Sequence, residues 1–229
     1  MFRELLAAWR KTDPMKDMYT SLLEMVDACE WMFGVVSKAS LKGEVDAETK
    51  EEVYKRDIGV NKAERSIRRR VVEHLAVQPG ADIPACLILM SVVKDAERLG
   101  DYCKNLLEAT ELQNAPLAEC KFAGTFEELH KEILTFFAKT KRAIAESDEV
   151  LAQEVIMEER DTTQRCDALV KRLASGELTA KLAVPWALMA RHLKRICAHL
   201  GNVASSLVMP IHKLDYYDEK YLKGQEPQD

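Results

Sequence analysis

Two carboxylates near the middle of the chain have a spacing that suits metal binding. Glu97 and Asp101 are four residues apart in a segment with helical periodicity, so both side chains project from one helix face, one turn apart. Carboxylate oxygens are ligands for hard and borderline cations. The same spacing is common on solvated helix faces, so this pair leaves metal binding and a plain charged surface both open.

A second group of oxygen-bearing side chains precedes the first along the chain. Asp57 and Asn61 are also four residues apart, and Glu64 follows them. If the two helices pack together, the two faces offer four oxygen ligands, as in metal sites between facing helices of bundles. The sequence therefore predicts a metal site whose ligands are Asp57, Asn61, Glu97 and Asp101.

An internal repeat is visible around this motif. Arg98 aligns with Arg195, and Asn105 aligns with Asn202, at the same offset of 97 residues (195 minus 98). A constant offset of this kind suggests that a three-helix unit was duplicated.

The second copy of the motif has lost its acids. Glu97 aligns with Lys194, and Asp101 aligns with Ala198. Because a protonated lysine cannot ligate a cation, the second copy should not hold a metal in the same way. We expect Lys194 to form an ion pair with Glu159 on the preceding helix.

The histidines and catalytic motifs do not indicate an enzyme. His192 and His199 are seven residues apart on one helix face, His74 and His130 lie among charged residues, and His212 lies near the end of the chain. The chain has no HExxH, GxSxG, P-loop or GxGxxG pattern. The sequence predicts surface or hydrogen-bonded core histidines and no catalytic site.

Six long helices are expected to position these residues. Apolar side chains at three- and four-residue spacing predict helices over residues 15–39, 46–76, 84–112, 125–146, 148–174 and 182–208. Pro84 suits the first turn of its helix, and Thr125 with Glu128 resembles a capping box.

These helices predict an all-α fold of two tandem three-helix bundles related by internal duplication. Residues 1–116 would form the first bundle with an N-terminal extension, and residues 124–209 would form the second. Residues 210–229 would form a C-terminal tail.

Composition limits the classes of function. The chain is 47% hydrophobic and 31% charged with only 9 Gly and 7 Pro, which is typical of a folded, helix-rich protein. A net charge of −5 argues against nucleic-acid binding. The longest apolar stretch, residues 85–93, is about half of a membrane span. Arg3 and Glu4 interrupt the apolar segment that a secretory signal would need, so we expect a cytoplasmic protein.

The cysteines support the same compartment. The chain has six cysteines without a CxxC pair, and each falls in or beside an apolar helical pattern. We expect them to be reduced and to pack as small core residues.

The motif on the third predicted helix resembles a known signature. Residues 97–101, Glu-Arg-Leu-Gly-Asp, followed by Asn105 and Leu106, are similar to the signature of the PhoU family. Asp57, with Asn61 and Glu64 after it, resembles the companion motif on the preceding helix. The resemblance extends over residues 15–208.

The resemblance implies both a fold and a role. PhoU proteins are non-enzymatic, often homo-oligomeric pairs of three-helix bundles whose acidic motifs hold Fe, Zn, Mg or Mn. They link a phosphate ABC transporter, through its ATPase, to a sensor kinase as negative regulators of the phosphate regulon, and they reach the membrane only through these partners. Asp57, Glu97 and Asp101 match the acidic positions, with Asn61 as a weaker oxygen donor.

The departures from the family pattern leave alternatives open. Asn61, Lys194 and Ala198 put the number of cations in question, and a sodium-phosphate symporter could replace the ABC transporter as partner. A metal-free helical adaptor would have the same fold. A ferritin-like oxidase would need a pair of Glu-x-x-His motifs projecting into the bundle, and the chain has no such pair.

Overall fold

The computed structural model describes residues 13–80, 82–113, 115–176 and 178–214. These residues form six α-helices: α2 (Asp13–Lys42), α3 (Ala47–Val77), α4 (Ile83–Glu111), α5 (Ala123–Glu146), α6 (Glu149–Ala174) and α7 (Ala180–Ser205). Two short 3₁₀ helices follow: η1 (Leu117–Glu119) lies between α4 and α5, and η2 (Ile211–Lys213) comes after α7. The described residues contain no strand. The all-α prediction is confirmed. Residues 1–12, in the predicted N-terminal extension, and residues 215–229 of the tail predicted over residues 210–229 lie outside the described residues. The described part of that tail contains η2.

Side chains at the helix starts explain where several helices begin. The Asp46 carboxylate accepts a hydrogen bond from the backbone N–H of Thr49 at 2.7 Å and caps α3. Asp148 caps α6 in the same way through Leu151 N–H at 3.0 Å. Such caps satisfy backbone donors that have no partner within the helix.

The capping box predicted for α5 is wrong. This helix begins at Ala123, and no side chain caps it. Thr125 therefore lies inside the first turn, because the buried Phe122 and the turn after Cys120 bring the chain into helix earlier than the box predicts.

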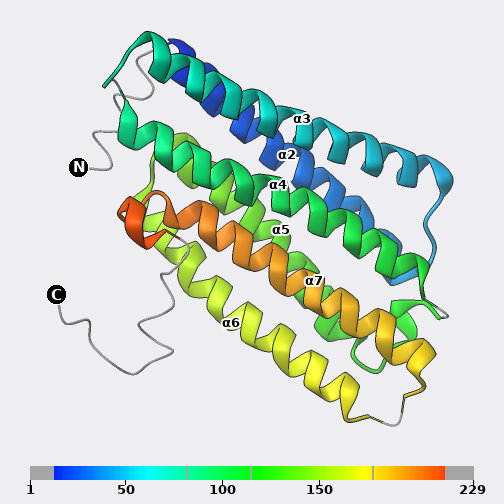
Figure 1. Ribbon diagram of the computed structural model, residues 1–229. Helices are drawn as coiled ribbons and strands as arrows, with labels where there is room; N and C mark the ends of the chain where they lie inside the picture. Colours follow the sequence, from blue (N-terminus) through cyan, green and yellow to red (C-terminus); the bar gives the residue numbers. More distant parts are fainter. Residues whose placement is uncertain (1–12, 81, 114, 177, 215–229) are drawn as a thin grey trace.

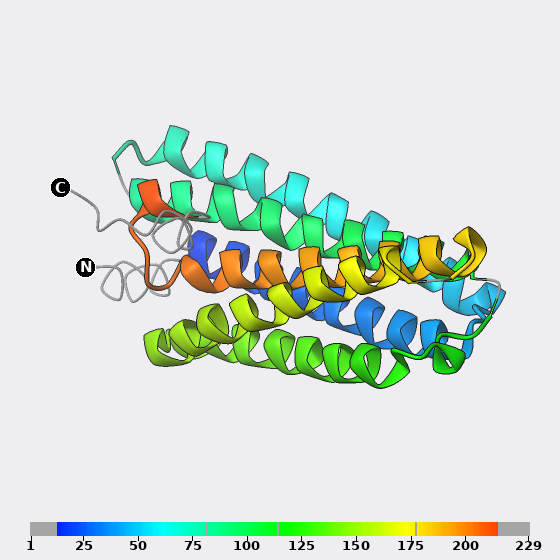
Figure 2. The same ribbon diagram turned by 90° about the horizontal axis from the view of Figure 1, so that it is seen from below.

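The helices form two sets of three. Helices α2, α3 and α4 pack together, and so do α5, α6 and α7. Helices α4 and α7 run antiparallel side by side at the centre, with α3 and α6 at the outer edges (Figure 1). In the view turned by 90°, the axes of all six helices lie roughly along the long axis of the molecule (Figure 2). This is the predicted fold of two tandem three-helix bundles.

One hydrophobic core extends through both sets of helices. Phe33 of α2 lies against Phe137 of α5, with ring centroids 5.7 Å apart, so the contact between α2 and α5, which also joins the two sets, includes apolar packing. Because the core is shared, the domain limits at residues 116 and 124 stay a prediction. All six cysteines are free and buried, as expected.

Within the described ranges, no helix combines the length and apolar character needed to cross a bilayer.

Candidate functional site

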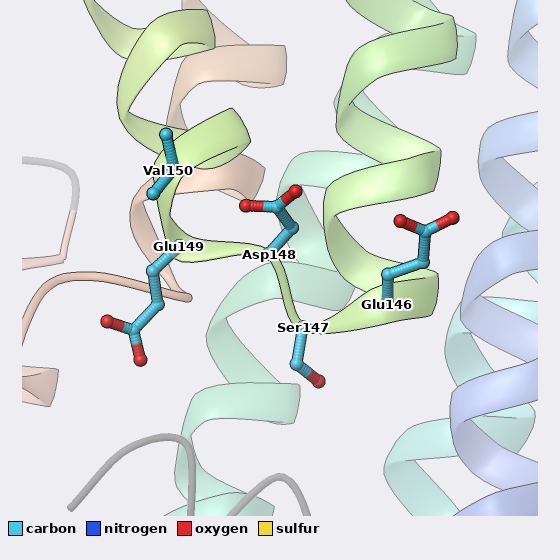
Figure 3. Close-up of a pocket in the computed structure, with 5 residues that line it drawn as sticks. All are labelled: Glu146, Ser147, Asp148, Glu149 and Val150. Atoms are coloured by element: carbon cyan, nitrogen blue, oxygen red, sulfur yellow. The ribbon is translucent and has the colours of Figure 1, made fainter.

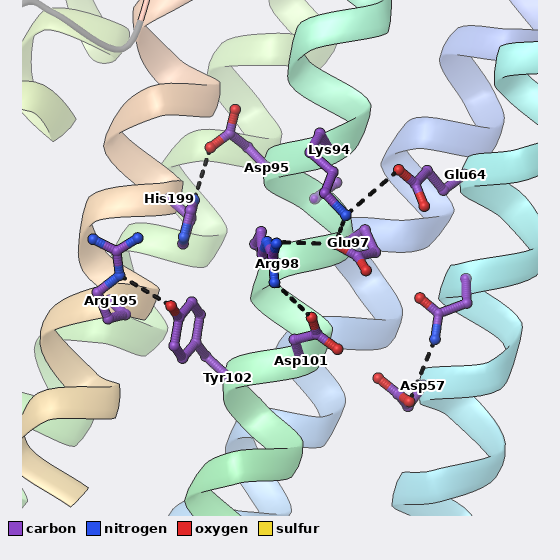
Figure 4. Close-up of polar contacts among 12 residues, drawn as sticks. Asp57, Glu64, Lys94, Asp95, Glu97, Arg98, Asp101, Tyr102, Arg195 and His199 are labelled. Carbon is purple, nitrogen blue, oxygen red and sulfur yellow. Dashed lines mark hydrogen bonds and ion pairs between the residues drawn. The ribbon is translucent and has the colours of Figure 1, made fainter. Parts of the chain in front are cut away.

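The predicted ligands lie on facing parts of α3 and α4 (Figure 4). Asp57 and Glu64 occupy the buried stripe of α3, because they are spaced one or two turns from Val60 and Ile67 on the same face. Gly100 of α4 lies against this face of α3, at a distance where a Cβ would make only ordinary contacts. A Cβ at this position would lie 3.5 Å from Val60 Cγ1 and 3.7 Å from Asp57 Oδ1.

A lysine lies between two of the predicted ligands. Lys104 Nζ is 3.0 Å from Asp57 Oδ2 and 3.3 Å from Asp101 Oδ1. Asn61 Nδ2 lies 3.5 Å from the same Oδ2 of Asp57. Burial alone would lower the pKa of Lys104. The hydrogen bonds and negative charges of Asp57 and Asp101 outweigh burial, so the pKa of Lys104 is raised. The ammonium is therefore charged at neutral pH.

Glu97 faces other cations. Lys94 Nζ is 2.7 Å from Glu97 Oε2 and reaches across to Glu64 Oε1 at 3.9 Å. Arg98 lies 3.9 Å from Glu97 and 3.1 Å from Asp101 Oδ2. The fold thus brings Asp57 and Asp101 to one shared ammonium and leaves Glu97 one turn away.

These contacts form a continuous row of alternating charges, which we call the charge row. In order of contact it contains Arg68, Glu64, Lys94, Glu97, Arg98, Asp101, Lys104 and Asp57. Four carboxylates alternate with four cations, so the row is neutral. Two of its contacts, Lys94 with Glu64 and Lys104 with Asp57, cross from α4 to α3.

In this arrangement the donor set does not fit a metal ion. Among the described residues, no three His, Cys, Asp or Glu side chains converge closely enough to hold one. A cation between Asp57 and Asp101 would have to displace Lys104. The site at Asp57, Asn61, Glu97 and Asp101 stays a prediction from the sequence.

In the second repeat, the structure pairs Lys194 with an acid other than Glu159, and the expected Lys194–Glu159 pair stays a prediction. Lys194 Nζ pairs with Asp167 Oδ2 on α6, about 12 Å of helix rise beyond Glu159. The offset of 106 residues that matches Val60 with Cys166 also matches Asn61 with Asp167 (167 minus 61). The second repeat, like the first, therefore has an ion pair between its last two helices, with the lysine on the last helix and the acid on the preceding one.

A polar network that sequence reasoning missed joins the two repeats. Asp95 Oδ1 accepts from His199 Nδ1 at 2.7 Å and from Asn202 Nδ2 at 2.8 Å. Tyr102 stacks on His199 at 5.5 Å between ring centroids and lies 6.0 Å from His192. At the 97-residue offset Asp95 is equivalent to His192, and Tyr102 is equivalent to His199. The Asp95–His199 and Tyr102–His192 contacts are therefore equivalent contacts in the two repeats, a relation that the offset could have suggested.

The turn between α5 and α6 forms a depression of about 410 Å³ (Figure 3). Glu146, Ser147, Asp148, Glu149 and Val150 line it. Three carboxylates in five residues repel anions, so this depression does not suit free phosphate.

Comparison with known proteins adds to this geometry. A family model described as the PhoU domain matches residues 22–110 and 126–207. The chain belongs to the PhoU family. The matched segments of this PhoU-family chain are its two three-helix sets, separated by the connection that contains η1.

Two solved PhoU structures are similar in fold. PhoU from Pseudomonas aeruginosa has a TM-score of 0.76 and 20% identity, over 87% of this chain and 97% of that chain. The phosphate transport system regulatory protein PhoU from Streptococcus pneumoniae has a TM-score of 0.64 and 18% identity, over 93% and 100%. No curated protein matches this sequence. At these identities the two structures establish the shared fold of PhoU proteins.

Proposed function

We propose that this protein regulates phosphate uptake and phosphate-starvation signalling as a helical adaptor without catalytic activity. The match of the PhoU domain model to both halves of the chain carries this proposal. The similar protein from Streptococcus pneumoniae is described as a phosphate transport system regulatory protein, which supports the same role.

The partners we propose are proteins of phosphate transport and sensing. The adaptor would act in the cytoplasm, as a homo-oligomer, between the ATPase of a phosphate ABC transporter and a sensor kinase. A sodium-phosphate symporter is the second candidate for the transporter, because Asn61, Lys194 and Ala198 depart from the family pattern.

We favour the form of this adaptor that needs no metal. The metal-dependent form would use Asp57, Asn61, Glu97 and Asp101 as ligands for Fe, Zn, Mg or Mn. Each of the three carboxylates in this set already has a lysine or arginine partner, which supports a neutral, ion-paired face.

The test is the output of a phosphate-responsive promoter in phosphate-rich medium, with the gene deleted and then restored. Constitutive output after deletion, silenced by restoration, is the expected result. A chain carrying Leu99→Asp is the negative control, since this fully buried position of α4 cannot accept a carboxylate, and the unfolded chain should not restore silencing.

A second measurement separates the two transporters. Phosphate uptake is compared in strains that lack the ABC transporter or the symporter, each with and without this gene. The gene should change uptake only when its partner transporter is present. If neither promoter output nor uptake responds to the deletion, the proposed function is wrong.

A further inference from the structure

The two carboxylates that meet across α3 and α4 are held by one internal cation. Asp57 and Asp101 both contact Lys104 Nζ, at 3.0 and 3.3 Å. The side chains of Lys104 and Asp57 are 22% and 8% exposed. Water therefore screens this interaction only partly, and its attraction exceeds that of a surface pair.

The ammonium lies where a bridging metal ion would have to lie. A divalent cation needs carboxylate oxygens at about 2.0 to 2.6 Å, closer than either oxygen is to Lys104 Nζ. The second oxygen of Asp101, Oδ2, is also engaged, by Arg98 at 3.1 Å. A metal ion would thus have to expel Lys104 and compete with Arg98.

The other carboxylates on this face, those of Glu97 and Glu64, are likewise paired with cationic side chains. Glu97 and Glu64 share Lys94, and Glu64 also contacts Arg68 at 3.2 Å. The charge row carries no net charge that would attract a further cation.

We propose that Lys104 is a built-in counter-ion that takes the place of a metal ion between Asp57 and Asp101. The protein therefore holds its α3–α4 face together without a bound cation. Replacing Lys104 by a neutral side chain of similar length exposes a latent site for a divalent cation formed by Asp57 and Asp101, with Asn61 beside them.

The test measures Mn²⁺ binding to the purified full chain by equilibrium dialysis, with Mn²⁺ as the only added metal. The variants are Lys104→Met and the matched control Lys55→Met, an exposed lysine of α3 that pairs with Glu52 at 3.5 Å. Circular dichroism checks that each variant is folded.

We expect the wild type and Lys55→Met to bind Mn²⁺ only weakly, and Lys104→Met to bind one Mn²⁺ about tenfold more tightly or better, since a neighbouring positive charge is removed. Adding Asp101→Asn to Lys104→Met should abolish this gain. The proposal is wrong if a folded Lys104→Met variant binds Mn²⁺ no more tightly than the wild type. It is also wrong if the wild type already binds Mn²⁺ as tightly as Lys104→Met and loses that binding in Asp101→Asn.

A measurement on the wild type keeps the test independent of the variant's folding. The Tm of the metal-free chain should be the same in EDTA and in Mn²⁺, because no cation contributes to the native state. A clear rise of Tm in Mn²⁺ would contradict the built-in counter-ion. Neither experiment depends on phosphate signalling, so failure here leaves the proposed function standing.

Discussion

His199 Nδ1 lies 2.7 Å from Asp95 Oδ1, although the two residues are 104 positions apart in the chain. Both are buried, and they join α4 of the first repeat to α7 of the second. The same carboxylate oxygen accepts from Asn202, so Asp95 satisfies two donors at the centre of the molecule.

Asp95→Ala should therefore lower the free energy of unfolding substantially. It leaves the buried His199 and the partly buried Asn202 without this acceptor, and we expect a loss of about 2 to 3 kcal/mol. Urea denaturation measures it. Asp161→Ala, at an exposed position of α6, is the control and should change stability by less than about 0.5 kcal/mol. Equal effects of the two variants would show that the network contributes nothing.

His130 should make stability depend on pH. Sequence reasoning placed this residue among charges, but it is buried against Phe33, with ring centroids 5.9 Å apart. In the described part of the chain neither of its ring nitrogens has a hydrogen-bond partner. Burial lowers its pKa from 6.5 to about 4. The folded state therefore favours the neutral ring.

Because the pKa of His130 is lowered in the folded state, acid should destabilise the protein. Between pH 6.5 and about 4 the His130 ring is protonated in the unfolded chain but stays neutral in the folded chain. The free energy of unfolding therefore falls as pH falls through this window. The wild type should lose about 3 kcal/mol there relative to His130→Leu. Unfolding curves at several pH values measure the difference. His212→Leu, at an exposed position, should follow the wild type, and parallel curves for all three would refute the assignment.

Two glycines should respond to alanine in opposite directions. Gly43 follows α2 with φ of +75°, and a Cβ there would lie 2.9 Å from Pro116 Cα. Gly43→Ala should destabilise by about 1 to 2 kcal/mol. Gly59, inside α3, has open space around it, so Gly59→Ala should stabilise by about 0.5 to 1 kcal/mol through helix propensity. Thermal unfolding compares them; stabilisation by both substitutions would mean that the Pro116 contact imposes no strain.

The cysteines should be unreactive in the native protein. All six are buried and free, and burial raises the pKa of Cys166 to about 12. Thiolate is the reactive form, so a colourimetric thiol reagent at neutral pH should label the native chain slowly and all six thiols after denaturation. Rapid labelling of one thiol before denaturation would place that cysteine at the surface.

Much of the fold could be predicted from the sequence because helices are local. The apolar spacing predicted six helices whose ends lie within about three residues of those observed. Pro84 lies in the first turn of α4 as expected. The position of Thr125 inside α5 was missed because the start of that helix depends on packing of Phe122, not on a local cap.

The candidate site was predictable only in part. Spacing placed Asp57 and Asn61 on one face of α3, and Glu97 and Asp101 on one face of α4, and the helices do pack together. Which charges meet there depends on the axial register between α3 and α4, which spacing within one helix does not contain. That register puts Lys104 between Asp57 and Asp101.

The same distinction holds for the molecule as a whole. Periodicity, chain breaks and the 97-residue offset indicated the helices and the duplication, and the motif at residues 97–101 indicated the family, because these are properties of nearby residues and of repeated order. The tertiary structure decided the partners of Lys194 and Asp95. Long side chains pair across helices only after packing has set the distance and register between their backbones.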